Sequence, residues 1–333
     1  MASLRVGLQG CGGMGKGLVS QLITLENVEL VAGADCFEES RITFNKEYNV
    51  PVFETLTDML AGIELDAVIV ATPNQLHEPN TVEVAAAGKH VFCEKPMSLT
   101  LQACQNMIDA CKNAGVKLQI GQVLQYLPDF AKALDMVKSG ELGEPRHGLI
   151  QRYSAPQANW GHTWRDDPAK VGHYLFEVSV HEIDFMRRIF GKPVAVSGWD
   201  VTMRPDKSLW ARASNGAIEF ESGAMCLIIE GMFNPISTSQ VDIVGSEGAI
   251  RFNWGGTFQY APVGEGEGWT KPSSELAEGL ENGLRRELRE WVEAIVEDKP
   301  CTIPGEDGKA NIELALAILK SSELKARVTL PLE

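Results

Sequence analysis

The feature that most constrains this chain is a glycine-rich loop directly after a short apolar run. The run Leu4–Gln9 has the length and composition of a buried strand, and Gly10-Cys11-Gly12-Gly13-Met14-Gly15 follows it. The loop matches the pattern GxGxxG, and helical spacing covers residues 17–26. The pattern alone is weak, because 32 of the 333 residues are glycine. In the order strand, loop and helix, it predicts the start of a dinucleotide-binding βαβ unit.

A carboxylate at the expected distance strengthens this interpretation. Asp35 lies 20 residues after Gly15, at the end of a second expected strand, residues 29–34. Gly10 would permit a tight turn, Gly12 a close approach of the backbone to a pyrophosphate, and Gly15 the packing of helix on strand. The helix N-terminus offers unpaired N–H groups to phosphates. The predicted cofactor-binding residues of this region are Gly10, Gly12, Gly13, Met14 and Asp35.

Asp35 also indicates which cofactor the site accepts. A carboxylate can accept hydrogen bonds from both ribose hydroxyls, whereas it repels a 2′-phosphate. Cys36 and Phe37 follow, and Arg41 is the first cation after Asp35. The sequence therefore favours NAD over NADP.

The first part of the chain alternates strand and helix signals. Apolar runs at residues 66–71, 90–93 and 116–120 are typical of strands, and helical spacing covers residues 78–88 and 100–114. Such alternation predicts βαβ units and a parallel sheet.

The second half shows a different pattern. Helical spacing covers residues 129–138 and 174–189, and pairs of apolar runs flank turn residues at 221–224 and 245–248. Successive hairpins predict an antiparallel sheet. The other expected elements are a loop at 260–274 and two closing helices, 284–297 and 308–326. We therefore predict an α/β Rossmann domain at residues 1–121 and an α+β domain at residues 122–333, whose last helix can pack back on the first domain.

Charge and cysteine content exclude several kinds of partner. A net charge of −15 repels nucleic acid and anionic lipid, which proteins bind through Lys and Arg. The sequence contains no run of about 18 apolar residues, so no membrane span is expected. The first residues show neither the basic nor the apolar region of a signal peptide, so we expect a cytoplasmic protein. The seven cysteines are scattered without a CxxC pair and are expected to be reduced, buried thiols.

A lysine follows the strand expected at residues 90–93, within Glu94-Lys95-Pro96. Open α/β sheets bind their ligands at this carboxyl end of the strands. Beside the positive charge of an oxidised nicotinamide, a partly buried lysine loses its proton more readily. Lys95 is therefore a candidate proton donor or acceptor, although such a lysine in isolation is more often a surface residue.

Residues 172–184 hold a second group of candidates. If this segment is helical, Glu177, His181 and Asp184 fall at i, i+4 and i+7 on one face of an otherwise apolar helix. A histidine flanked by carboxylates suits proton transfer at neutral pH. His173, Glu177 and His181 also have spacing that metal ligands can adopt, but no fourth ligand is near and no metal is predicted. Buried histidines satisfied by helix neighbours are the remaining alternative.

Together these motifs resemble the glucose-fructose oxidoreductase, inositol dehydrogenase and MocA (Gfo/Idh/MocA) family, along nearly the whole chain. The resemblance includes the Gly10–Gly15 loop, the run Asp66–Asn74 with His77, Glu94-Lys95-Pro96, Trp164-Arg165 ahead of Gly172, His181 with Asp184 (HxxD), the Gly245–Gly248 hairpin and Gly305-Glu306-Asp307-Gly308. Glu-Lys-Pro followed by HxxD is specific, although neither motif is so alone.

The resemblance implies a Rossmann domain and a second domain with a large, mostly antiparallel sheet that forms the interface of a homodimer or homotetramer. It also implies a catalytic set, which by position is Lys95, Glu177 and His181. The residues implied to line the cofactor are Thr72, Pro73, Asn74, His77, Glu94 and Lys95, and those expected to bind substrate are Gln122, Trp164, Arg165, His173 and Asp184.

Three departures from the family pattern surround the expected substrate pocket. Glu177 stands where aspartate is usual, and His173 and Ser179 replace glycines. Gln125-Tyr126 occupies the place of an arginine–aromatic pair. These departures bear on the identity of the substrate rather than on the reaction.

The leading hypothesis is an NAD-dependent dehydrogenase that oxidises a CH–OH group of a sugar, polyol or glycoside. Either His181 or Lys95 would take the hydroxyl proton, and Glu177 would orient the hydroxyl. One alternative is a glycosidase or lyase that keeps its NAD and oxidises its substrate transiently. Another is a non-catalytic sensor of NAD or a sugar, although a sensor needs no proton relay.

Overall fold

The computed structural model describes residues 3–155, 164–203, 211–232, 236–264 and 281–332. The chain forms two compact units, which are described one at a time. Unit 1 comprises residues 1–123, 169–171 and 281–312, and unit 2 comprises residues 124–168, 172–280 and 313–333. The domain boundary after residue 121 stays a prediction.

Unit 1 is built on a six-stranded parallel sheet with the order β3-β2-β1-β4-β5-β6. Its strands are β1 (Leu4–Gln9), β2 (Val28–Ala34), β3 (Val52–Phe53), β4 (Ala67–Val70), β5 (His90–Cys93) and β6 (Leu118–Ile120). All four residues of β4 are buried, as expected of a strand covered on both faces. The strand order reverses between β1 and β4, which confirms the predicted Rossmann arrangement.

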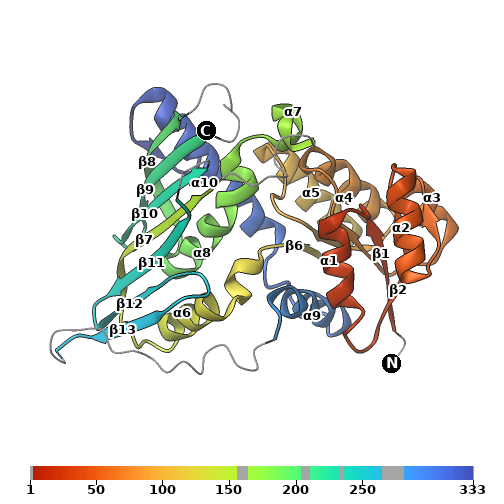
Figure 1. Cartoon of the computed structure of the whole chain (residues 1–333), viewed down its shortest axis with the longest axis horizontal. Coiled ribbons are helices and arrows are strands. Elements are labelled where there is room, and N and C mark those ends of the chain that lie inside the picture. The colour runs from red at the N-terminus through yellow and green to blue at the C-terminus, as the bar shows by residue number, and fades with distance from the viewer. Residues whose placement is uncertain (1–2, 156–163, 204–210, 233–235, 265–280, 333) are drawn as a thin grey trace. The chain divides into compact units, whose positions relative to one another are not determined.

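Helices flank this sheet in Figure 1. They are α1 (Gly13–Leu22), α2 (Glu38–Tyr48), α3 (Leu56–Gly62), η1 (Asn74–Leu76), α4 (His77–Ala86), α5 (Leu101–Ala114) and α9 (Gly283–Val296). Leu8, Leu18, Phe92 and Trp291 lie in one hydrophobic core, so α9 packs with the first strands and helices although it comes late in the chain.

Unit 2 is built on an eight-stranded sheet with the order β13-β12-β11-β7-β10-β9-β8-β14. Its strands are β7 (Pro145–Ser154), β8 (Pro193–Thr202), β9 (Arg212–Phe220), β10 (Met225–Met232), β11 (Thr238–Gly245), β12 (Gly248–Phe252), β13 (Phe258–Pro262) and β14 (Val328–Thr329). Only the pairing of β7 with β10 is parallel among these described strands. The prediction of a mostly antiparallel sheet is confirmed.

The structure changes one expectation in this sheet. Residues 260–262, expected as the start of a loop, end β13 and pair with β12, because Tyr260 opposes Ile250 in a regular antiparallel register. The rest of that expected loop falls largely on residues 265–280, which lie outside the described residues.

The helical segments of the second half of the chain are η2 (Val123–Tyr126), α6 (Pro128–Lys138), η3 (Trp164–Asp166), α7 (Pro168–Val171), η4 (Leu175–Ser179), α8 (Val180–Phe190) and α10 (Gly305–Leu324). Figure 1 shows α6 and α8 on one face of the sheet. Along β10, Cys226, Ile228 and Glu230 are buried on that side, whereas Met225, Leu227 and Ile229 alternate with them and are more exposed. One face of the sheet is therefore core, and the other carries an apolar strip.

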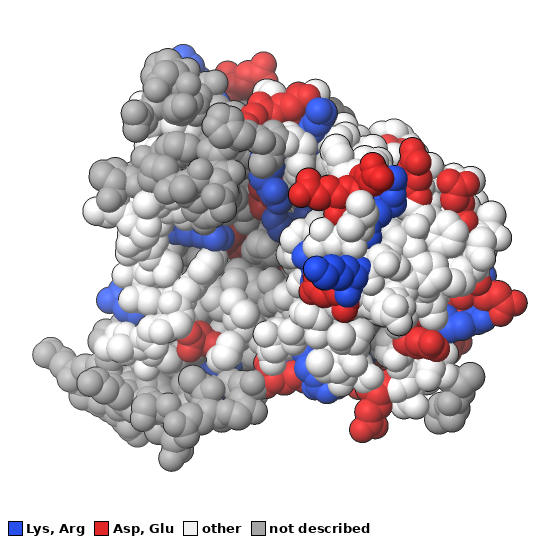
Figure 2. Space-filling model, turned by 45° about the vertical axis from the view of Figure 1, so that its right-hand side comes forward, with Lys and Arg blue, Asp and Glu red and all other residues white. Residues whose placement is uncertain are grey.

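The charged residues, helices and cysteines of the described segments bear on the predictions about charge, membrane spans and thiols. In the face shown in Figure 2, acidic and basic residues are interspersed rather than gathered by sign. Among the described residues, no helix has both the length and the apolar character of a membrane span. All seven cysteines lie in described segments as free thiols; Cys36 is exposed, Cys301 is partly buried and the others are buried. A cytoplasmic location stays a prediction.

Candidate active site

The glycine loop leaves open space at the N-terminus of α1. Gly12 is the N-cap residue, and no side chain caps the helix there. Within the described part of the chain, no heavy atom beyond the chain neighbours and the helix's own backbone lies within 4 Å of the position that a Cβ would take at Gly12 or Gly13. The first N–H groups of α1 are therefore accessible, which is how helix N-termini bind phosphate.

Two other glycines are required by close packing. Gly10 has a φ of +100°, and a Cβ there would lie 2.5 Å from the Ala71 carbonyl oxygen. A Cβ at Gly15 would lie 2.1 Å from the Gly10 carbonyl oxygen. Any larger residue would displace the loop from β4 or α1 from the loop, so the sequence pattern has a steric cause.

Asp35 ties the glycine loop to the end of β2. Its Oδ2 accepts a hydrogen bond from the Cys11 backbone N–H at 2.9 Å, and its Oδ1 accepts one from Phe37 N–H at 2.8 Å. A carboxylate can accept about four hydrogen bonds, so both oxygens keep capacity for ribose hydroxyls. Arg41 Nη1 donates to the Asp35 carbonyl oxygen at 2.8 Å, so part of the hydrogen-bonding capacity of this guanidinium is used within the protein. Burial and the Asp35 charge raise the pKa of Cys11 to about 12, which keeps this thiol neutral.

The loops after β4 and β5 lie on the same edge of the sheet. Because β1, β4 and β5 are parallel neighbours, their carboxyl ends meet there. Thr72, Pro73 and Asn74 follow β4, and the buried Asn74 donates to the Val171 carbonyl oxygen at 3.2 Å. After β5, buried Glu94 accepts a hydrogen bond from the Lys95 backbone N–H at 3.1 Å, and Lys95 itself is half-buried.

A buried carboxylate that the sequence analysis missed lies at the end of β6. Glu287, on α9, accepts a hydrogen bond from the Gln122 backbone N–H through Oε1. Gln122 is 1% exposed, and neither atom of its side-chain amide has a hydrogen-bond partner among the described residues. The available signal was a charged residue within the apolar stripe formed by Leu284, Leu288 and Trp291.

In unit 2, the prediction of regular α-helical spacing around Glu177 is wrong. Leu175–Ser179 forms a π-helical turn, and the α-helix begins only at Val180. A π turn has an i→i+5 pattern, so Glu177 and His181 are not spaced as the α-helical i, i+4 argument required. π turns occur frequently at functional sites.

Three of the predicted site residues contact one another in unit 2. Arg165 Nε donates to Glu177 Oε1 at 2.8 Å, and the Glu177 side chain is 6% exposed. The Arg165 guanidinium carbon lies 4.4 Å from the centroid of the Trp164 ring. Trp164, Arg165 and Glu177 thus form one stacked and ion-paired group.

His173 and Asp184 have other partners. The Leu175 backbone N–H donates to His173 Nδ1 at 3.1 Å, and His173 Nε2 lies 3.5 Å from Asp200 Oδ1. Asp184 is 2% exposed and accepts from Arg188 Nε at 2.7 Å. His173 and Glu177 therefore engage different groups, and the described residues contain no cluster of three or more His, Cys, Asp or Glu that could hold a metal ion. Half-buried His181 lies in the first turn of α8.

Asp200 remains ionised despite its burial. Burial disfavours its charged form, but the nearby His173 ring and hydrogen bonds from Arg212 and Ser214 outweigh this and hold its pKa well below the usual range. The Ser214 hydroxyl donates to Oδ1 at 2.5 Å. Asp200 was not recognised from the sequence, because it lies in an ordinary strand and its partners come from elsewhere.

A second buried cluster behind the π turn was also missed. The Tyr174 hydroxyl donates to Glu230 Oε2 at 3.0 Å, and Arg152 Nη1 donates to Glu182 Oε1 at 2.9 Å. Burial and the nearby Glu182 charge raise the pKa of Glu230 well above its usual value, although Arg152 opposes the shift. This cluster fixes Tyr174, the residue before the π turn, to strand β10.

Comparisons with known proteins agree with this architecture. Residues 4–122 match a model described as an oxidoreductase family with an NAD-binding Rossmann fold. Residues 135–330 match the C-terminal alpha/beta domain of the same oxidoreductase family.

Individual relatives cover nearly the full chain. The rhizopine catabolism protein MocA of Rhizobium meliloti is 26% identical in an alignment of 337 positions, which covers 98% of this chain and 96% of that protein. Myo-inositol 2-dehydrogenase of Thermotoga maritima is 25% identical in an alignment of 335 positions, which covers 98% of each chain. A levoglucosan dehydrogenase in complex with NADH and L-sorbose shares the fold, with a TM-score of 0.89, 22% identity and full coverage of both chains.

Proposed function

From the premise that this chain belongs to the Gfo/Idh/MocA oxidoreductase family, we propose that it oxidises a secondary alcohol of a sugar, polyol or glycoside. The membership confirms the predicted family, the oxidoreductase class and the NAD-binding Rossmann domain. The sugar or polyol class is supported by the activities named for its relatives, which include an inositol dehydrogenase.

One observation carries the proposal: the open glycine loop, Asp35 and the Lys95 segment share the carboxyl edge of one parallel sheet. A dinucleotide fits this edge, because the N-terminus of α1 is uncovered at Gly12 and Gly13 and Asp35 keeps lone pairs for ribose hydroxyls. Gly10, Gly12, Gly13, Met14 and Asp35 would hold the adenosine and pyrophosphate half. Thr72, Pro73, Asn74, Glu94 and Lys95 would line the other half.

The chain's own residues would handle the proton. NAD, when bound, supplies the hydride acceptor. His181 or Lys95 takes the hydroxyl proton, and Glu177 orients the substrate hydroxyl. The ion pair between Arg165 and Glu177 fixes the direction of this buried carboxylate.

Five residues are proposed as substrate contacts, each argued within its own unit. Gln122 offers a buried amide with both donor and acceptor capacity unused among the described residues, which suits recognition of a hydroxyl group. Trp164 would cover an apolar ring face, Arg165 and His173 would bind oxygen atoms, and Asp184 would contribute through its pairing with Arg188.

We further infer that the chain forms a homodimer or homotetramer through the exposed side of the unit 2 sheet. Met225 is 40% exposed, and Leu227 and Ile229 continue the same strip along β10. Met232, farther along β10, is buried and belongs to the core.

The deciding experiment is an absorbance screen at the NADH band with NAD and, separately, NADP, against aldoses, inositols and glycosides. We expect NADH to appear with one substrate class and NAD to be preferred. Substrate loss without NADH, with NAD found on the purified protein, would replace the dehydrogenase by an enzyme that recycles its cofactor. No turnover and no nucleotide binding would contradict both.

A further inference from the structure

The ring of His77 lies between two carbonyl oxygens that belong to different loops. Its Nδ1 is 2.7 Å from the Pro96 carbonyl oxygen, and its Nε2 is 2.9 Å from the Thr72 carbonyl oxygen. His77 is 1% exposed and is the first residue of α4. The ring therefore bridges the loop after β4 and the loop after β5.

A carbonyl oxygen only accepts hydrogen bonds, so each contact needs a proton on the ring nitrogen. A neutral imidazole carries one N–H and one lone pair. The lone pair of its unprotonated nitrogen would therefore face a lone pair of a carbonyl oxygen at hydrogen-bond distance. Only the imidazolium form donates on both sides. Such charge-assisted hydrogen bonds are about twice as strong as neutral ones.

We propose that His77 is held as an imidazolium and acts as a positioning residue, clamping together the two loops that carry the cofactor and proton-transfer residues. The role in catalysis rests on the proposed function, whereas the charge of the ring does not. The family resemblance implies that His77 lines the cofactor, and this stays a prediction. In the structure both ring nitrogens contact backbone carbonyl oxygens of the protein.

The two carbonyls belong to segments that matter for the site. Thr72 directly precedes Pro73 and Asn74, and Asn80 of α4 also donates to the Thr72 hydroxyl at 3.1 Å. Pro96 directly follows Lys95. A shift of either carbonyl therefore moves a predicted nicotinamide contact or the candidate lysine.

The charged residues next to His77 in the chain and on the two bridged loops are Glu78, Glu94 and Lys95. On α4 the next residue is Glu78, whose Oε1 accepts from Asn106 of α5 at 2.6 Å. After β5 they are Glu94 and Lys95, while residues 71–76 after β4 contain no titratable side chain. The helix N-terminus disfavours a cation at this position, and the two carbonyl acceptors oppose that effect.

His90 provides a matched control within unit 1. The Lys117 backbone N–H donates to His90 Nδ1 at 3.0 Å, so that nitrogen is an acceptor. Burial and the nearby Lys117 charge lower the pKa of His90. His90 is therefore expected to be neutral, with one protonated and one unprotonated ring nitrogen.

The first test is ¹⁵N NMR of the full chain labelled at histidine, without cofactor, at a pH two units above the ordinary histidine pKa of about 6.5. We expect one ring with both nitrogens protonated, assigned to His77 by its loss in His77→Gln, and a neutral ring for His90. If the His77→Gln chain does not fold, single His→Gln variants of the other five histidines, which are His90, His147, His162, His173 and His181, assign the wild-type spectrum by elimination. A neutral His77 ring overturns the proposal.

The second test separates positioning from folding. In His77→Gln and His77→Leu we expect kcat to fall at least tenfold and the Kd for NAD to rise by about tenfold, the usual effect of losing a charged hydrogen bond, with the circular dichroism unchanged. His90→Gln should change neither value more than about twofold. If His77 is an imidazolium but the protein has no dehydrogenase activity, the charge of the ring is confirmed and the proposed function is rejected. Full activity in both His77 variants would reject the role of His77 as a clamp.

Discussion

Each carboxylate oxygen of Asp35 accepts one backbone N–H, from Cys11 on one side and from Phe37 on the other. In Asp35→Asn an NH₂ group would replace one of these acceptors and face a donor. We expect the Kd for NAD to rise between about 10- and 100-fold, because hydrogen bonds to a charged group are worth about 1.5–3 kcal/mol, while the Kd for NADP changes little. Isothermal titration with both cofactors measures this.

Asp109→Asn is the matched control. Asp109 is an exposed carboxylate of the same unit, and its Oδ1 accepts a hydrogen bond from Gln105 Nε2 on the same helix. It should bind NAD like the wild type. Equal losses in the two variants would mean that net charge, and not the Asp35 site, sets the affinity.

Lys95 lies at the end of β5 beside buried Glu94. We expect Lys95→Met to reduce kcat by about 10²–10⁴-fold, the range for a positioned proton-transfer group, and to leave the Kd for NAD within about twofold. Single-turnover kinetics with the substrate found in the absorbance screen measures the first value. The control Lys112→Met removes an exposed cation from α5, and near-normal turnover in Lys95→Met would remove Lys95 from the mechanism.

Some residues of the site could be predicted from the sequence because their constraint is local. Gly10 is required by its φ of +100° and by a neighbouring carbonyl oxygen, and Asp35 follows the loop at a fixed distance. His77 and Glu287 differ, since their partners are the backbone atoms of Thr72, Pro96 and Gln122. Backbone partners leave no trace in residue types, so the sequence marks Glu287 only as a charge within an apolar stripe and shows neither residue's contacts.

Whether a helix or strand can be predicted from the sequence depends on the pattern of its buried residues. The four buried residues of β4 form an apolar run that indicates a strand. Only Phe44 is buried in α2, so this helix lacks the apolar periodicity that sequence reasoning requires. All five residues of the π turn are buried, and no polar face marks where the α-helical spacing fails.

The cluster behind the π turn predicts a pH dependence of stability. The folded state keeps the proton of Glu230, whose pKa burial raises, whereas the unfolded state loses it near pH 4.3, about the ordinary value. The cluster's contribution is therefore fully present below that pH and is lost as the pH rises toward the folded pKa. As the pH rises above about 4.3, the ordinary glutamate pKa, we expect Glu230→Gln to lose less unfolding free energy than the wild type.

Urea unfolding at several pH values measures this difference. Glu221→Gln is the control, because Glu221 lies in an exposed turn of the same sheet and is 66% exposed in its pair with Lys192. The control should follow the wild type at every pH. A Glu230→Gln curve parallel to that of the wild type would show that Glu230 is ionised in the folded state.

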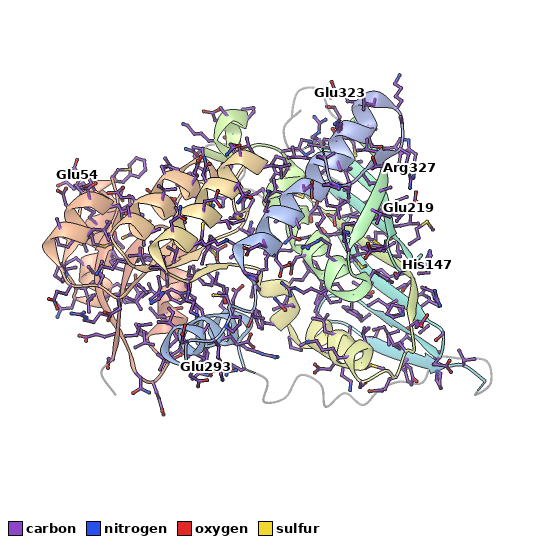
Figure 3. The ribbon with its side chains drawn as sticks, turned by 180° about the vertical axis from the view of Figure 1, so that it is seen from behind. Glu54, His147, Glu219, Glu293, Glu323 and Arg327 are labelled. Atoms are coloured by element: carbon purple, nitrogen blue, oxygen red, sulfur yellow. The ribbon has the colours of Figure 1, made fainter. Side chains whose placement is uncertain are left out.

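For the whole molecule, the question is what covers the outer side of the unit 2 sheet. Leu227 of β10 lies opposite Leu149 of β7 and Ala217 of β9. At the next position along this face, His147, Met225 and Glu219 lie side by side, and Figure 3 shows His147 and Glu219 on the side of the sheet away from α8. A polar rim therefore borders an apolar centre, which is typical of a protein–protein interface.

A second copy of the chain is the occupant that the family resemblance favours, and stable interfaces bury about 800 Å² on each partner. In Leu227→Glu a carboxylate would have to lose its water at the centre of that area, a cost of several kcal/mol. We expect sedimentation velocity to show two or four chains per particle for the wild type and smaller particles for the variant. Val296→Glu, which changes a 48% exposed valine on α9 of unit 1, should keep the wild-type mass. A wild type that sediments as a single chain at micromolar concentration would leave the apolar strip without a partner of its own kind.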